Sequence, residues 1–145
     1  MRELEILKKI LNQEFEAESR YIEHINKIRT PIIRKMLKDL KAEESKHKRQ
    51  LITLIKNLDE DFNEKEYAET KKILPEEPGT ENFKLVQALL ELDKEAEEES
   101  YKEYTEASNE LDTPIREILI KFRNDEDIHI KKIKNLIDQL AMLNR

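Results

Sequence analysis

Two stretches of the chain, TPIIRKMLKDLKAEESKH at residues 30–47 and TPIREILIKFRNDEDIH at residues 113–129, share one pattern and decide the fold. Each begins with threonine and proline, which favour the N-cap and the first position of a helix. Apolar residues then recur at helical spacing, until a glutamate and a histidine three residues apart take the same inward positions. Both stretches are therefore predicted to begin long helices that turn one face toward a core.

Working outward from these stretches, the apolar spacing predicts four long helices, at about 2–28, 31–58, 83–111 and 114–143. The connections after the first and third helices are short, which favours two antiparallel hairpins, residues 2–58 and 83–143. The predicted fold class is all-α, a four-helix bundle within one domain, residues 1–145.

A stretch of different character, residues 59–82, joins the two hairpins. It holds Pro75, Pro78 and the only glycine of the chain, Gly79. It is long enough to run the length of a bundle, so we expect a long crossover with a short helix around residues 64–73.

The composition excludes several classes of protein. Of 145 residues one is glycine, none is cysteine, and 41% are charged. A single glycine cannot supply the turns of a β-sandwich or a glycine-rich phosphate loop. The lack of cysteine excludes disulfides, zinc ribbons and thiolate chemistry, so any metal must be held by oxygen and nitrogen. Disorder is the competing interpretation of so much charge, and the helical periodicity argues against it.

The charge balance also limits the partners. The net charge is −6, from 27 Lys and Arg against 33 Asp and Glu. No basic patch stands out, so neither nucleic acid nor a membrane surface is an expected partner. The N-terminal residues lack the apolar core of a signal peptide, and no apolar run reaches transmembrane length. We therefore expect a soluble, cytoplasmic protein.

The two hairpins resemble copies of one another. A shift of 83 positions aligns identical residues: Glu14 with Glu97, Tyr21 with Tyr104, Thr30 with Thr113 and Pro31 with Pro114. After one deletion the shift is 82, and it aligns Arg34 with Arg116, Glu44 with Glu126 and His47 with His129. Such a repeat implies a pseudo-twofold axis, which places equivalent side chains opposite each other near the centre of the bundle.

Ionisable residues interrupt the apolar face of each long helix. In the second helix the inward positions are Ile33, Leu37, Leu40, Glu44, His47, Leu51, Leu54 and Leu58. In the fourth helix they are Ile115, Leu119, Phe122, Glu126, His129, Ile133, Leu136, Leu140 and Leu143. The first helix has Glu14, Glu18 and Tyr21 on its inward face, and the third has Glu97 and Tyr104.

Four inward glutamates in one layer need a cation between them, because a buried carboxylate without a partner is strongly disfavoured. A Glu-x-x-His pair places both side chains on one helical face, one turn apart. A Glu from each of two helices and a Glu-x-x-His from each of the other two form the ligand set of dinuclear carboxylate bundles. The candidate metal ligands are Glu14, Glu44, His47, Glu97, Glu126 and His129. Oxygen-rich sites with one nitrogen per metal suit iron or manganese better than copper or zinc.

The alternative interpretation of these residues is a solvated charged face, and for Glu14 and Glu97 a neighbouring acidic residue is the alternative inward group. Glu18 is a candidate extra ligand, or a group that supports a ligand. Tyr21 and Tyr104 lie two turns from the glutamates of their helices and are kept as candidate catalytic residues, although a hydroxyl bonded to a carboxylate is favoured over a redox role.

His24 differs from the other two histidines. Its counterpart in the repeat is Ala107. We interpret it as a surface histidine or as one whose hydrogen bonds are satisfied within the fold.

With this pattern the sequence resembles the ferritin-like superfamily, and most closely its rubrerythrin-related and short bacterial members. The matching pattern is Glu14-x6-Tyr21 with Glu44-x-x-His47, and Glu97-x6-Tyr104 with Glu126-x-x-His129. The resemblance implies a non-haem di-iron site in which Glu44 and Glu126 bridge, Glu14 and Glu97 are terminal, and each histidine binds one iron. It also implies oxidation of Fe(II) by dioxygen or reduction of hydrogen peroxide, in iron homeostasis or oxidative-stress defence, with an unknown electron donor.

The sequence also departs from that family. Rubrerythrins usually carry a cysteine-ligated rubredoxin domain, which a chain without cysteine cannot have. A further carboxylate of rubrerythrin would fall near Ser100 or Tyr101 and is absent. Without the fifth helix of cage-forming ferritins, a homodimer is expected. The alternative function is a non-catalytic metal-binding or metal-sensing module, and a third is a helical interaction protein without metal.

Overall fold

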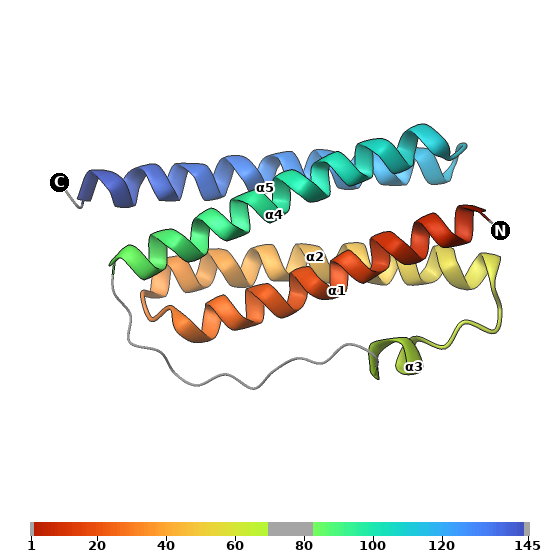
Figure 1. Ribbon diagram of the computed structural model, residues 1–145, viewed down its shortest axis with the longest axis horizontal. Helices are drawn as coiled ribbons and strands as arrows, with labels where there is room; N and C mark the ends of the chain where they lie inside the picture. The colour runs from red at the N-terminus through yellow and green to blue at the C-terminus, as the bar shows by residue number, and fades with distance from the viewer. Residues whose placement is uncertain (1, 70–82, 144–145) are drawn as a thin grey trace.

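The structure, a computed structural model, describes residues 2–69 and 83–143 (Figure 1). In these residues all regular secondary structure is helical: α1 Arg2–Lys27, α2 Pro31–Leu58, α3 Glu64–Glu69, α4 Phe83–Glu110 and α5 Ile115–Leu143. The four long helices begin and end within one residue of their predicted bounds. The short helix predicted around residues 64–73 ends at Glu69, and the remainder of that prediction, like Pro75, Pro78 and Gly79, lies outside the described residues.

The long helices form two antiparallel hairpins, α1 with α2 and α4 with α5, which confirms the predicted all-α bundle. Packing within each hairpin is far more extensive than packing between them. Between the hairpins, α1 runs antiparallel to α4, and α2 faces α5 (Figure 1). α2 ends and α4 begins at opposite ends of the bundle, as the predicted long crossover requires (Figure 1).

The helix α3 lies against the outside of the first hairpin (Figure 1). Its Tyr67 packs on Phe15 of α1, with ring centroids 5.5 Å apart, and on Phe62. The Tyr67 hydroxyl donates to the backbone carbonyl of Lys8, at 3.2 Å. Through these contacts α3, at the start of the crossover, packs against α1.

The repeat is visible in the way each hairpin closes. Arg34 of α2 donates to the carbonyls of Ile25 and Ile28, at the end of α1. Its counterpart Arg116 of α5 donates to the carbonyls of Ser108 and Leu111, at the end of α4, at 2.8 and 2.7 Å. The last carbonyls of a helix have no partner within the helix, so the two arginines satisfy the same need at equivalent turns.

Of the two helix starts predicted at Thr-Pro pairs, the one at Thr113 and Pro114 differs from its prediction. Thr30 is the N-cap residue of α2 and Pro31 its first residue, as expected. Pro114 instead precedes α5, which begins at Ile115, and the Thr113–Pro114 peptide bond is cis. The equivalence of the two Thr-Pro pairs is thus one of sequence and not of backbone conformation.

The core consists of two apolar clusters with a polar layer between them. The first cluster includes Ile25, Leu37, Leu90 and Ile133, and lies toward the α1–α2 turn. The second includes Leu7, Leu51, Leu111 and Phe122, and lies toward the α4–α5 turn. On every long helix the segment between the two clusters carries a buried glutamate: Glu14, Glu44, Glu97 and Glu126.

Away from this layer the predicted inward positions are buried less completely. Leu54 and Leu136 are partly buried and pack against the apolar clusters, and their neighbours Ile55 and Ile137 are buried more deeply. Leu143, also expected inward, is 77% exposed. A strict seven-residue repeat departs from the 3.6-residue turn of a straight helix, so its register fails with distance from the point where it is set.

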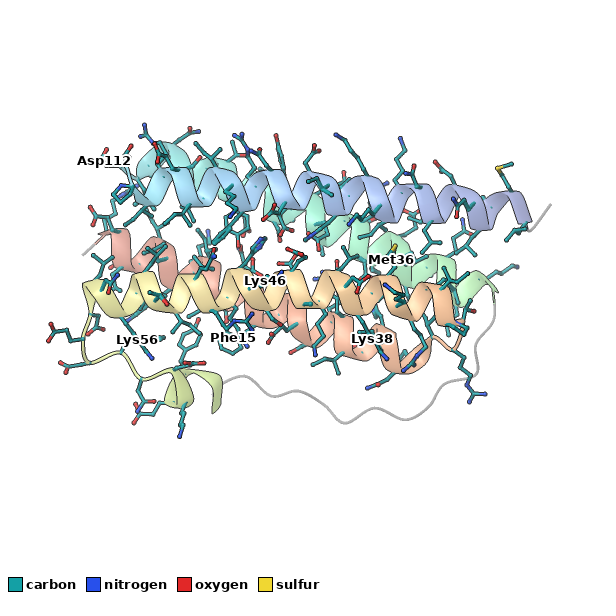
Figure 2. The ribbon with its side chains drawn as sticks, turned by 180° about the vertical axis from the view of Figure 1, so that it is seen from behind. Phe15, Met36, Lys38, Lys46, Lys56 and Asp112 are labelled. Atoms are coloured by element: carbon teal, nitrogen blue, oxygen red, sulfur yellow. The ribbon has the colours of Figure 1, made fainter. Side chains whose placement is uncertain are left out.

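Charged side chains cover the outer faces of the helices, and Lys38, Lys46 and Lys56 of α2 are exposed examples (Figure 2). Among the described helices, none combines the length and the apolar character needed to cross a bilayer.

Candidate metal centre

The polar layer brings together all six residues proposed as metal ligands. One group of possible ligand atoms comes from Glu14, Glu44, His47 and Glu126, and a second comes from Glu44, Glu97, Glu126 and His129. Within each group the atoms lie within 4.8 Å of one another. The carboxylates of Glu44 and Glu126 belong to both groups, which is the position expected of bridging ligands.

The two histidines face the carboxylates through the same ring atom. His47 Nδ1 lies 3.3 Å from Glu126 Oε1 and 3.6 Å from Glu44 Oε2. His129 Nδ1 lies 3.2 Å from Glu44 Oε1 and 3.6 Å from Glu97 Oε2. Each imidazole thus lies against the shared carboxylates, and the two ring centroids are 6.4 Å apart.

All six side chains are buried, with relative exposures of 0 to 3%. The hydrogen bonds of the layer leave several of these atoms without a partner. They are Glu14 Oε2, His47 Nδ1, Glu97 Oε2 and both carboxylate oxygens of Glu126. Buried polar atoms nearly always have a partner, so a cluster of unpartnered acceptors in one place is the arrangement that a bound cation would satisfy.

The layer also shifts proton affinities. Burial raises the pKa of the Glu14 carboxyl well above its ordinary value, and the nearby Glu44 raises it further. Burial lowers the pKa of His47, but the carboxylates of Glu14 and Glu44 raise it more, to about 11. Burial likewise lowers the pKa of His129, but the carboxylates of Glu44 and Glu97 raise it more, to about 9. Without a metal, protons on the two histidines therefore offset part of the charge of the four buried carboxylates.

The two tyrosines hold the glutamates of the opposite hairpin. The Tyr21 hydroxyl of α1 donates to Glu97 Oε1 of α4 at 2.5 Å, and the Tyr104 hydroxyl of α4 donates to Glu14 Oε1 of α1. Both rings are buried, and burial raises the pKa of each phenol well above its ordinary value. The crossed pairing follows from the pseudo-twofold relation between the hairpins. Each tyrosine fixes one oxygen of a glutamate and leaves the other oxygen directed at the layer.

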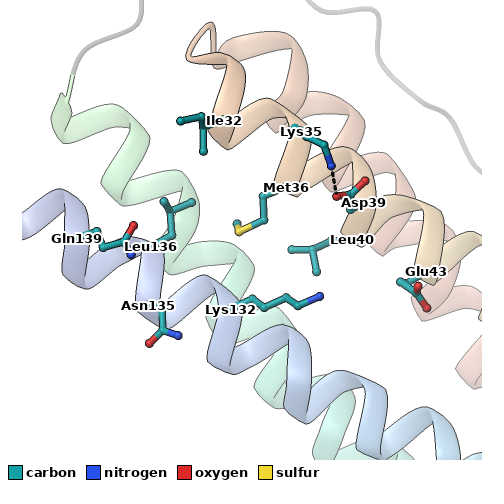
Figure 3. A pocket seen from close by; sticks show the side chains of 10 residues that line it. All are labelled: Ile32, Lys35, Met36, Asp39, Leu40, Glu43, Lys132, Asn135, Leu136 and Gln139. Carbon is teal, nitrogen blue, oxygen red and sulfur yellow. Dashed lines mark hydrogen bonds and ion pairs between the residues drawn. The ribbon is translucent and has the colours of Figure 1, made fainter.

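The surroundings of the two histidines are not equivalent. His47 Nε2 lies 2.9 Å from Asp125 Oδ2, and its ring stacks on Phe122 with centroids 4.2 Å apart. A shift of 82 makes Glu43 the counterpart of Asp125. Glu43 instead pairs with Lys46 at 3.7 Å and lines a groove of about 470 Å³ between α2 and α5 (Figure 3). The repeat therefore preserves the ligands and not all of their supports.

Glu18 lies outside both groups of ligand atoms. Its carboxylate accepts hydrogen bonds from Ser45 and Lys48 of α2, the latter at 2.9 Å. With a cationic partner already on its carboxylate, Glu18 links α1 to α2 and does not reach the layer, contrary to its candidacy as an extra ligand.

Sequence reasoning missed two acidic residues beside the centre. Asp125, which contacts His47, directly precedes Glu126. The helical spacing assigned the inward position to Glu126, so the role of Asp125 was not predicted. Asp93 is fully buried and contacts Arg20 and His24, which makes His24 a histidine whose bonding is satisfied inside the fold. The signal for Asp93 is its place on α4, because it falls four residues before Glu97, on the same helical face.

The donor set consists of four carboxylates and two imidazole nitrogens in a buried layer. It is suited to divalent first-row metals that prefer oxygen with some nitrogen. The layer is thus a buried carboxylate and histidine cluster able to bind metal.

Comparisons with known proteins agree with this geometry. A model of the Rubrerythrin family matches residues 5–137. No curated protein matches the chain. Among solved structures, a hypothetical protein from Pyrococcus furiosus has a similar fold, with a TM-score of 0.80 and 17% sequence identity. The match covers 97% of this chain and 91% of that one.

Proposed function

Because the chain belongs to the rubrerythrin family, we propose that its polar layer binds two iron ions, with manganese as the alternative metal. Glu44 and Glu126 would contact both ions. One ion would complete its protein ligands with Glu14 and His47, and the other with Glu97 and His129.

The proposed activity is the oxidation of Fe(II) by dioxygen, or the reduction of hydrogen peroxide with electrons from an external donor. Two bound ferrous ions would supply two electrons, one each, which with two protons from solvent reduce dioxygen to hydrogen peroxide or hydrogen peroxide to two waters. In the peroxide reaction the external donor would return the two ions to the ferrous state. The surrounding residues do the rest. The anionic carboxylates favour the higher charge of the ferric state, and the two apolar clusters restrict water on either side of the layer.

The observation that carries this proposal is the unpartnered state of the buried donor atoms. Glu126 is 0% exposed and neither of its carboxylate oxygens has a hydrogen bond; only Oε1 has cationic neighbours when the histidines are protonated, His47 Nδ1 at 3.3 Å and His129 Nδ1 at 3.8 Å. A carboxylate in that position is strongly disfavoured unless it is protonated or bound to a cation. The tyrosine hydroxyls support the same conclusion, since they occupy one oxygen of Glu14 and of Glu97 and leave the other available.

Metal analysis of the purified protein tests the binding step. We expect about two metal ions per chain in the wild type, loss of both in Glu44→Ala, whose carboxylate belongs to both groups of ligand atoms, and loss of one in His129→Ala, which belongs to one group. Glu16→Ala is the matched control, because Glu16 lies two residues from Glu14 on α1 but is exposed. Metal content that is unchanged in Glu44→Ala would rule the proposal out.

Stopped-flow mixing of the Fe(II)-loaded protein with dioxygen or with hydrogen peroxide tests the redox step. A rapid absorbance change with one oxidant identifies the preferred reaction. A loaded protein that reacts with neither would be a metal-binding module without turnover, and the redox part of the proposal would be wrong.

A further inference from the structure

Three polar residues close one flank of the centre, at the contact between α1 and α4. Asp93 of α4 is fully buried. Its Oδ1 accepts a hydrogen bond from Arg20 Nε at 2.9 Å, and its Oδ2 lies 2.9 Å from His24 Nδ1. Both oxygens of the carboxylate are thus engaged by α1, and the cluster of Arg20, His24 and Asp93 forms a buried link between the two hairpins.

This cluster is connected to the centre through Tyr21. The Arg20 guanidinium lies over the Tyr21 ring, 4.8 Å from its centroid, while the Tyr21 hydroxyl donates to Glu97. Asp93 holds Arg20 in this position, and it lies one turn from Glu97 on α4. The Tyr21 ring is packed against Arg20 and its hydroxyl is bonded to Glu97, so the side chain has few alternative rotamers. The hydroxyl is therefore held toward Glu97.

The opposite flank has no such cluster. Adding 83 to positions 10, 20 and 24 gives 93, 103 and 107, so Ile10, Glu103 and Ala107 are the counterparts of Asp93, Arg20 and His24. These three counterparts line a cavity of about 200 Å³. Equivalent positions of the repeat therefore hold a hydrogen-bonded polar cluster on one flank and line a cavity on the other.

We propose that Arg20, His24 and Asp93 are positioning residues for one of the two metal positions, the one formed with Glu97 and His129. They act by holding Tyr21 against Glu97. The position formed with Glu14 and His47 does not depend on them, since Tyr104 donates to Glu14 and Asp125 contacts His47. The proposal rests on the proposed function, because it assigns a role toward a bound metal.

A swap of the flank tests this role. The variant His24→Ala/Asp93→Ile replaces His24 and Asp93 by the residue types of their counterparts, Ala107 and Ile10. Replacing a buried ion pair by apolar residues commonly leaves a fold intact, and circular dichroism verifies this. Asp93→Asn is the second variant, because it keeps the shape of the side chain and removes its charge. The matched control is Ile10→Ala, which changes the hollow flank instead.

Titration with Co(II), followed by its visible absorption, measures the binding of each ion. We expect the swap to weaken one of the two ions about tenfold, as for other residues that support a ligand, and to leave the second unchanged. The effect should persist in a His47→Ala background and disappear in a His129→Ala background. Equal weakening of both ions, or an effect that survives without His129, would overturn the proposal.

A second measurement uses the metal-free protein, so it is independent of the proposed function. The hydroxyl proton of Tyr21 should be visible by NMR and slow to exchange, and the swap should accelerate its exchange while the Tyr104 hydroxyl is unaffected. An unchanged exchange rate at Tyr21 would refute the positioning role even where cobalt binds. A wild type that binds no cobalt would instead refute the proposed function.

Discussion

At the scale of single residues, the centre depends on hydrogen bonds that cross from one hairpin to the other. Tyr104 donates to Glu14, and Tyr21 donates to Glu97. A buried carboxylate that loses such a donor is left with an uncompensated charge or must take up a proton.

We expect Tyr104→Phe to lower the unfolding free energy of the metal-free protein by about 1–3 kcal/mol, since the ring still packs but Glu14 loses its donor. Urea denaturation measures this. Tyr101→Phe is the control, because the Tyr101 side chain is 37% exposed and lies on the outer face of the same helix. Equal stability of the two variants would show that the buried hydroxyl contributes nothing.

The pKa of His129 gives a prediction for pH. It is raised to about 9 from an ordinary value of 6.5, burial opposing the shift and the nearby carboxylates of Glu44 and Glu97 outweighing it. A group with a raised pKa in the folded state contributes stability that is complete below its unfolded pKa and lost as the pH rises through its folded pKa. The melting temperature of the metal-free protein should therefore fall between pH 6.5 and about 9. A flatter profile is expected for His129→Gln, and a wild-type melting temperature that rises over this range would contradict the assignment.

At the scale of helices, the ends of α1 and α4 are completed by residues from the helices that follow them. Arg34 and Arg116 each bond two carbonyls of the preceding helix. Neither arginine touches the centre, so their effect should appear in stability alone.

Arg34→Ala and Arg116→Ala are each expected to lower the unfolding free energy by about 1–3 kcal/mol, the range for hydrogen bonds from charged groups. Lys35→Ala, next to Arg34 but with a side chain that is 79% exposed, should change it by less than about 0.5 kcal/mol. Thermal or urea denaturation separates these cases. A loss confined to one arginine would show that the two turns are not equivalent in energy.

The helices themselves could be predicted almost completely from the sequence, because apolar spacing and the Thr30–Pro31 start are local signals. The six residues of the polar layer were predictable because the repeat doubled a weak motif. What could not be predicted depends on which neighbours meet across the bundle. Asp93 is an ordinary acidic residue on α4 until Arg20 and His24 are placed against it, and the deeper burial of Ile55 beside Leu54 depends on which neighbours α2 meets.

At the scale of the whole molecule, the centre joins two units that otherwise contact each other sparingly. Each hairpin has its own extensive packing, whereas the contacts between hairpins are few. Each hairpin also supplies three of the six proposed ligands: Glu14, Glu44 and His47 from one, Glu97, Glu126 and His129 from the other. Bound metal would therefore hold the hairpins together.

Removal of metal by a chelator should lower the melting temperature of the wild type, because the ions bind the folded protein and not the unfolded chain. Calorimetry with and without the chelator measures the difference. Glu44→Ala should melt at the same temperature in both conditions. A wild type that is equally indifferent to the chelator would indicate a bundle that needs no metal.

The even division of ligands between the hairpins has a consequence for how the centre could be assembled. If the chain is interrupted between α3 and α4, neither fragment holds more than half of the donor set, and complementation of the two would be required for any ion to bind. Metal affinity would then depend on fragment concentration. A single hairpin that pairs with itself would likewise present four carboxylates and two imidazoles, so a dimer of either fragment would offer a donor set of the same composition.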